Sequence, residues 1–87
     1  MNSKVEYLQF PCAFPLKVMG LNNAAFEQAV RGILQKHLQA ESIEYASHLS
    51  SSGKYLSLTA TFLATSREQL DALYCELHGH ELVVMTL

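Results

Sequence analysis

The stretch Tyr55-Leu56-Ser57-Leu58-Thr59-Ala60-Thr61-Phe62-Leu63-Ala64 carries the clearest secondary-structure signal in the chain. Apolar residues alternate with mostly hydroxyl-bearing ones, and a period of two indicates a β-strand with one buried face. Just before it, the segment Ser50-Ser51-Ser52-Gly53-Lys54 predicts a hairpin turn, because Gly53 can take the positive φ that such turns need. The residues expected to point inward are Leu56, Leu58, Ala60, Phe62 and Ala64.

Three further segments carry strand patterns, at residues 14–19, 43–49 and 82–87. The first alternates clearly and is followed by Gly20 and two asparagines, which favour a turn. The second leads into the hairpin turn and alternates less sharply. The inward residues expected of the first segment are Phe14, Leu16 and Val18.

Two helices are predicted between these strands. Asn23 is a suitable N-cap for the first, and apolar residues then recur at helical spacing as far as His37. The segment Thr65-Ser66-Arg67-Glu68 predicts a capping box that opens the second, and Gly79 predicts a left-handed stop. The expected core residues of the second helix are Leu70, Leu73, Tyr74 and Leu77.

The order strand–helix–strand–strand–helix–strand predicts an α+β, ferredoxin-like βαββαβ sandwich. Its four-stranded antiparallel sheet would have both helices on one face and the strand order 4-1-3-2. The length of 87 residues suits one small domain, which we place at residues 14–87. Residues 1–13 show no sustained period and are interpreted as an extended N-terminal arm, held by Leu8 and Phe10.

Composition excludes several classes of function. The chain has 6 Lys and Arg against 8 Asp and Glu, a net charge of −2, which argues against binding to nucleic acid or anionic membranes. It has no apolar run long enough for a membrane span, and its first ten residues lack the apolar core of a signal peptide. We therefore expect a cytoplasmic protein in which Cys12 and Cys75 are free thiols.

RNA-recognition modules share this topology. Those modules stack bases on aromatic residues of their central strands. Here Gly53-Lys54-Tyr55 offers one aromatic residue, and the outward positions that follow are Ser57, Thr59 and Thr61. No nucleic-acid partner is expected.

The histidines are candidate metal ligands and candidate catalytic bases. His78-Gly79-His80 could contribute two metal ligands, but a site needs three or four converging ligands, so we expect no metal and no cofactor. His37 ends the apolar stripe of the first helix, where a histidine also interacts favourably with the last carbonyl groups. A small hydrolase or transferase that uses His37 or His78 with a serine is the alternative function.

Several stretches of the chain resemble the YbeD-like family of small bacterial proteins, sometimes labelled lipoate-regulatory. They are FPCAFPLKVMG (10–20), SSGKYLSLT (51–59), the segment from Ala64 to Leu77, and VVMTL (83–87). The resemblance implies an ACT-like variant of the ferredoxin-like fold, similar to the regulatory domain of phosphoglycerate dehydrogenase. It brings no catalytic residues, and it implies a non-enzymatic regulatory or adaptor role, linked to lipoate metabolism by the family's label.

Two regions are candidate binding sites. In ACT-like domains the effector site lies near the turn after the first strand, so a small carboxylate-bearing metabolite is expected at Gly20, Asn22 and Asn23, beside the free N–H groups of a helix start.

A partner protein is expected on the uncovered face of the sheet, with the chain itself a monomer or weak homodimer. A second copy could also add strands at the edge formed by residues 43–49. The residues assigned to the partner surface are Lys17, Met19, Tyr55, Ser57, Thr59 and Thr61, with Glu44 and His48 beside them and Val84 if Val83 and Met85 point inward.

Overall fold

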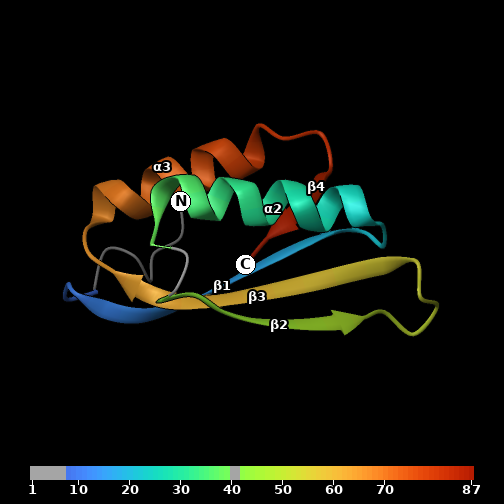
Figure 1. Cartoon of the computed structure of the whole chain (residues 1–87), viewed down its shortest axis with the longest axis horizontal. Coiled ribbons are helices and arrows are strands. Elements are labelled where there is room, and N and C mark those ends of the chain that lie inside the picture. The colour runs from blue at the N-terminus through green and yellow to red at the C-terminus, as the bar shows by residue number, and fades with distance from the viewer. Residues whose placement is uncertain (1–7, 40–41) are drawn as a thin grey trace.

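The computed structural model of the chain describes residues 8–39 and 42–87. The described elements follow the predicted order and form one antiparallel sheet, β2-β3-β1-β4, with both helices on the same side of it (Figure 1). This arrangement confirms the α+β, ferredoxin-like fold and the predicted strand order. The elements are β1 (Cys12–Leu21), α2 (Ala24–His37), β2 (Glu44–Leu49), β3 (Tyr55–Ala64), α3 (Arg67–His78) and β4 (Val83–Thr86).

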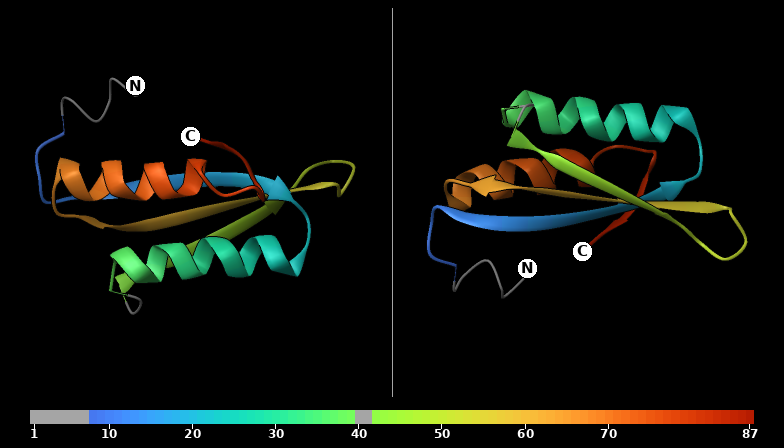
Figure 2. Two further views of the ribbon diagram at one scale, coloured as in Figure 1. Left: turned by 90° about the horizontal axis from the view of Figure 1, so that it is seen from above. Right: turned by 60° about the horizontal axis from the view of Figure 1, so that its bottom comes forward.

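The two long strands β1 and β3 form the centre of the sheet. They pair along their whole length, from Cys12 opposite Ala64 to Leu21 opposite Tyr55. The β2–β3 hairpin closes through Gly53, whose φ of 75° is the positive value expected of it. Figure 2 shows α2 and α3 side by side across one face, while the hairpin tip projects beyond them.

The core lies between this sheet face and the two helices. All five inward residues predicted for β3 are buried, as are the three predicted for β1. Alternate residues of a strand point to opposite faces, so one apolar set meets the helices and the other set does not. Phe14 and Phe62 touch across the two central strands, with ring centroids 6.1 Å apart. The helices contribute the buried residues Phe26, Val30, Ile33, Leu34, Leu70, Leu73 and Leu77.

Each helix begins with a side-chain cap. Asn23 Oδ1 accepts a hydrogen bond from the Phe26 N–H at 2.7 Å, as predicted for α2. In α3 the capping box lies one residue later than predicted, because Ser66 rather than Thr65 is the N-cap. Ser66 Oγ accepts from the Gln69 N–H at 3.1 Å, and the Gln69 side chain accepts from the Thr65 N–H at 2.9 Å.

β2 and β4 match the predicted segments to within one residue at each end, whereas β1 and the end of α3 differ more from the sequence predictions. β1 begins at Cys12, two residues inside the expected arm, and continues through Leu21, because β3 supplies a partner for each of these residues. Of the rest of that arm, Leu8 and Phe10 pack against the core, and residues 1–7 lie outside the described part of the chain. The segment Ala40-Glu41-Ser42 is predicted to break the helical period, and its first two residues lie outside the described part of the chain as well.

The end of α3 differs in conformation, because Gly79 is not left-handed. Its φ of −79° and ψ of −7° are right-handed values. The Gly79 N–H donates to the Cys75 carbonyl at 3.1 Å, and the chain then continues in tight turns, with the His80 N–H donating to the Leu77 carbonyl. The reversal into β4 is therefore spread over several residues and does not need a positive φ at the glycine.

Candidate binding surface

The side of the sheet opposite the helices is here called the open face. By the strand register, Lys17 lies opposite Thr59 on this face and Met19 lies opposite Ser57. Thr61 and Tyr55 follow on the same side of β3, opposite Pro15 and Leu21. The six residues predicted for a partner surface therefore share one face of the two central strands, and each is exposed or half-buried.

β4 adds apolar residues to this face that sequence reasoning missed. Its register with β1 shifts between Met19 and Gly20, so Met85 lies opposite Met19 while Val83 lies opposite Gly20. Met85 therefore points outward, so the condition for placing Val84 on the partner surface, that Val83 and Met85 both point inward, is not met; Val83 does pack against the core. Val84 is the extra residue of this bulge and is 57% exposed.

The apolar part of the open face gathers beside β4. Leu87 exchanges backbone hydrogen bonds with Lys17, so it follows Met85 on the same side. Met85 and Leu87 are 45% and 59% exposed. We call Met19, Met85 and Leu87 the β1–β4 patch. Leu21 and Leu63, also outward and exposed, lie at opposite ends of the central strands. Large exposed apolar side chains among hydroxyl groups are typical of a modest interaction surface.

Gly20 is explained by close packing inside the domain. A Cβ atom at this position would lie 2.3 Å from the Phe26 ring and 2.6 Å from the Leu82 carbonyl oxygen. Gly20 is buried, and the absence of its side chain lets the first turn of α2 and the segment before β4 approach β1. The glycine is thus required by the packing of these segments.

The asparagines of the same turn are also engaged within the chain. Asn23 caps α2 through Phe26, and Asn22 reaches the hairpin tip. The Asn22 side chain donates to the Gly53 carbonyl at 3.1 Å, and its backbone N–H donates to the Lys54 carbonyl at 2.9 Å. These contacts tie the start of α2 to the β2–β3 hairpin. The metabolite site predicted at Gly20, Asn22 and Asn23 stays a prediction.

A charged cluster joins the ends of the two helices. Glu76 on α3 receives Lys36 Nζ on one carboxylate oxygen at 2.7 Å and His37 Nε2 on the other at 2.8 Å. The hydrogen bond from Lys36, followed by that from His37, lowers the pKa of Glu76 below its ordinary value of 4.5. The interaction was not foreseen, because nothing in the sequence links residues so far apart.

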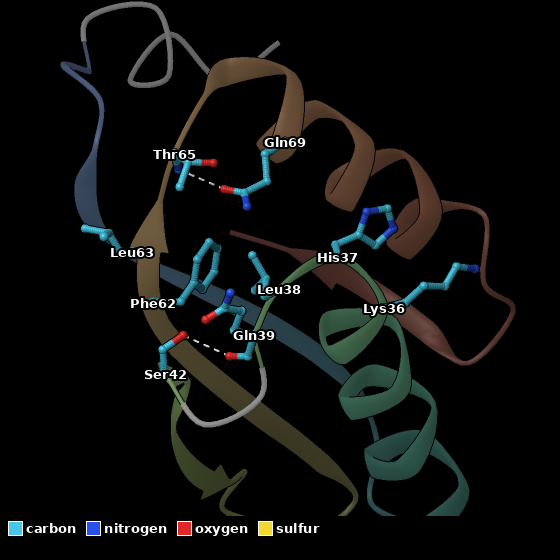
Figure 3. A pocket seen from close by; sticks show the side chains of 9 residues that line it. All are labelled: Lys36, His37, Leu38, Gln39, Ser42, Phe62, Leu63, Thr65 and Gln69. Atoms are coloured by element: carbon cyan, nitrogen blue, oxygen red, sulfur yellow. Dashed lines mark hydrogen bonds between the residues drawn. The ribbon is translucent and has the colours of Figure 1, made fainter.

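A hollow of about 590 Å³ lies at the far end of α2 from the Gly20 turn (Figure 3). Its wall includes His37 and Ser42, a histidine and a serine of the kind that the alternative function as a hydrolase or transferase would use. Ser42 Oγ donates to the Gln39 carbonyl at 2.8 Å, His37 pairs with Glu76, and the two side chains lie on opposite sides of the hollow. It is lined by Lys36, His37, Leu38, Gln39, Ser42, Phe62, Leu63, Thr65 and Gln69.

The two histidines considered as metal ligands, His78 and His80, also bond to different partners. His78 Nε2 lies 2.6 Å from Thr86 Oγ1, whereas His80 Nδ1 accepts from the Leu82 N–H at 3.1 Å. Over residues 8–39 and 42–87, no three His, Cys, Asp or Glu residues gather as a metal site would require. Cys12 is half-buried, Cys75 is exposed, and both are free. Within the same residues no helix is long and apolar enough to span a membrane.

Comparison with known proteins identifies the family. A family described as "Protein of unknown function (DUF493)" matches residues 5–87. The chain belongs to this family. It is 39% identical to the UPF0250 protein of Chromobacterium violaceum, over 99% of this chain and 98% of that protein, and 43% identical to the UPF0250 protein NE1487 of Nitrosomonas europaea, over 92% and 93%. The predicted YbeD-like membership is thereby confirmed.

A solved structure supports the fold independently of sequence. The solution structure of protein HP0495 from H. pylori matches with a TM-score of 0.66, at 15% identity, over 99% of this chain and 91% of that one. At this level of identity the likeness concerns the fold. No catalytic activity is named for the family or for these relatives.

Proposed function

We propose that this protein is a small non-enzymatic regulatory or adaptor domain that binds a partner protein through the open face of its sheet. The observation that carries the proposal is the composition of that face. Met85 and Leu87 are about half exposed, and they lie on the same side as Lys17 and the hydroxyl row of β3. An antiparallel sheet can leave one face in water, but a solvated face does not need exposed methionine and leucine side chains.

Apolar and polar side chains are unevenly distributed over the open face, which supports a partner that binds in one orientation. The β1–β4 patch is apolar, while β2 contributes Glu44 and His48 at the other border of the face. A partner with an apolar ridge and a polar flank would match this gradient. Interfaces of this kind have an apolar centre with a polar rim. The domain would then act by presenting a preformed surface. Among the described residues, His37 and Ser42 bond to different partners, and no three metal-ligating side chains gather.

The test is affinity capture from a bacterial extract with matched variants. Tyr55→Glu combined with Thr59→Lys places two charges on the open face and should abolish capture of the partner. A second variant, Met85→Lys, tests the β1–β4 patch by itself. Both should leave the melting temperature nearly unchanged, because the substituted side chains lie outside the core.

The matched control carries the same two charge changes on the helix side. Gln28→Glu with Ala72→Lys alters exposed residues of α2 and α3 and should retain capture. Capture that survives both open-face variants, or that is lost in the control alone, would contradict the proposal and redirect attention to the helices.

A small-molecule role at the Gly20 turn is tested separately. Thermal melting with a panel of amino acids and short carboxylic acids would detect it, because a ligand at about 100 times its Kd adds about 2.7 kcal/mol to the unfolding free energy. The variant Asn22→Ala should remove the shift caused by a ligand bound there. A shift that Asn22→Ala leaves intact would place the ligand elsewhere.

A further inference from the structure

The edge of the sheet formed by β2 has its outer side uncovered. β2 is the first strand in the order β2-β3-β1-β4, and Figure 1 shows no described segment beyond it. Except for Tyr45, every residue from Glu44 to Leu49 is exposed. The segment contains no proline or lysine, and its register with β3 has no bulge. Three devices that often block strand addition at an edge, namely proline, lysine and a bulge, are therefore missing from β2, and its one charged residue is Glu44.

The hairpin determines which backbone groups β2 presents outward. The Ser50 N–H donates to the Tyr55 carbonyl at 2.9 Å, so these two residues form a hydrogen-bonded pair. In an antiparallel ladder every second residue bonds to the same neighbour. His48, Ala46 and Glu44 therefore bond to β3. By the same alternation, the N–H and C=O groups of Leu49, Ser47 and Tyr45 point away from the sheet and can bond to an added strand.

The β2 edge is complementary to a second copy of itself when a two-fold axis relates the two copies at Ala46. Residues opposite each other must lie on the same face, so the axis has to place one residue of β2 opposite its own symmetry mate. With the axis at Ala46, residues 43–49 of both copies overlap fully, and Glu44 of each copy lies opposite His48 of the other. An axis at Ser47 would place Glu44 opposite Ser50, and one at Tyr45 would place it opposite Ala46.

We propose that two copies of this chain join edge to edge through β2, antiparallel about a two-fold axis at Ala46, to form one continuous eight-stranded sheet. Tyr45 and Ser47 of opposite copies exchange backbone hydrogen bonds. The two Glu44–His48 pairs lie on the open face, and the small Ala46 side chains meet at the axis. The interface consists of a strand ladder and two cross-strand pairs, which suits a weak, concentration-dependent dimer.

A charge exchange tests the register. The wild-type chain should show a concentration-dependent dimer in sedimentation equilibrium. In the variant His48→Glu, the carboxylate of Glu44 in each copy faces the new carboxylate at position 48 of the other copy, so the dimer should weaken about tenfold. The variant Glu44→His should weaken the dimer less. The double variant Glu44→His with His48→Glu recreates both pairs in reverse and should restore the affinity. A double variant as weak as the two single changes combined would contradict this register.

Cross-linking tests the axis directly. In a background with Cys12→Ser and Cys75→Ser, Ala46→Cys should form an intermolecular disulfide, since a non-hydrogen-bonded pair holds its Cα atoms about 4.5 Å apart. The matched control Thr59→Cys lies on the same face one strand inward, so its symmetry mate would be about 14 Å away and should not cross-link.

Proline substitution tests the backbone contribution. Ser47→Pro removes an outward N–H while leaving the bonds between β2 and β3 intact, and it should abolish the dimer with little change in melting temperature. A chain that stays monomeric at millimolar concentration, a dimer that Ser47→Pro leaves intact, or equal cross-linking at positions 46 and 59 would overturn the proposal. A monomer would leave this edge to a strand from a different protein.

Discussion

The two faces of the sheet are built from the same strands and differ in almost every other respect. On the helix side, Leu16, Val18 and Leu58 are at most 1% exposed. On the open side, the intervening residues of the same strands are exposed or half-buried and mix hydroxyl, charged and apolar groups. One face is constrained by packing against two helices, whereas the other is free to carry a binding function. Substitutions on the two faces test this division.

The largest effects should come from the covered face. Phe62→Ala and Leu73→Ala remove side chains that are at most 3% exposed, and each should destabilise the domain by about 2–5 kcal/mol, because a cavity remains between sheet and helices. The destabilisation caused by Leu56→Ala should fall in the same range, towards its lower end. Urea unfolding measures the change. A loss below that of the open-face variants would contradict the register of β3.

A glycine of the covered face should be nearly as sensitive as its large neighbours. Gly20→Ala places a Cβ against the Phe26 ring and a backbone carbonyl, so a loss of about 1–3 kcal/mol is expected. Gly32→Ala is the control, because no atom lies within 4 Å of its added Cβ and alanine favours a helix. Thermal melts of the two variants should move in opposite directions.

The helix layer depends on its caps. Ser66→Ala removes the acceptor for the Gln69 N–H and should reduce the unfolding free energy by about 1 kcal/mol. Thr65→Ala keeps the backbone N–H that bonds to Gln69 and should change little. Equal losses in the two variants would show that the cap is not confined to Ser66.

The open face should tolerate substitution. Ser57→Ala and Thr59→Ala should each change the unfolding free energy by less than about 1 kcal/mol, since their side chains point away from the core. Comparing Thr59→Ala with Leu58→Ala in one denaturation series gives the sharpest contrast between adjacent residues. A loss at Thr59 that approached the loss at Leu58 would break the distinction between the faces.

The smallest effect concerns pH and the link between the helices. The pKa of Glu76 is lowered in the folded state, so its contribution to stability is present above the ordinary value of 4.5 and is lost as the pH falls through the lowered value. Glu76→Gln should therefore be less stable than the wild type at neutral pH, with the difference shrinking in acid. Melting temperatures measured from pH 7 down to about pH 3 would show this convergence. A difference independent of pH would contradict it.

Most of the fold was predictable, because it depends on patterns that are local in sequence. The alternation in β3, the helical stripes and the turn at Gly53 together predicted the order of elements and the buried set. The shifted capping box shows the limit of this reasoning. Both Thr65 and Ser66 can cap a helix, and only the helix's first hydrogen bonds decide between them.

The composition of the open face was predictable in its centre but not at its border. Strand parity placed Lys17, Met19 and the outward side of β3 correctly. Met85 was missed because a bulge of one residue reverses parity along a strand of four residues. The cluster of Glu76 with Lys36 and His37 was also missed, because it depends on how two helices lie next to each other.

The position of β1 in the sheet has a consequence for the order in which the chain can fold. β1 is the first strand in the sequence, yet it pairs only with β3 and β4 among the described strands. During synthesis it has no sheet partner until Tyr55 and the residues after it have emerged. The backbone hydrogen bonds within the β2–β3 hairpin and within α2 are local in sequence, so these two elements can form early. The slow step is therefore expected to be the entry of β1 between β3 and β4, which closes long loops.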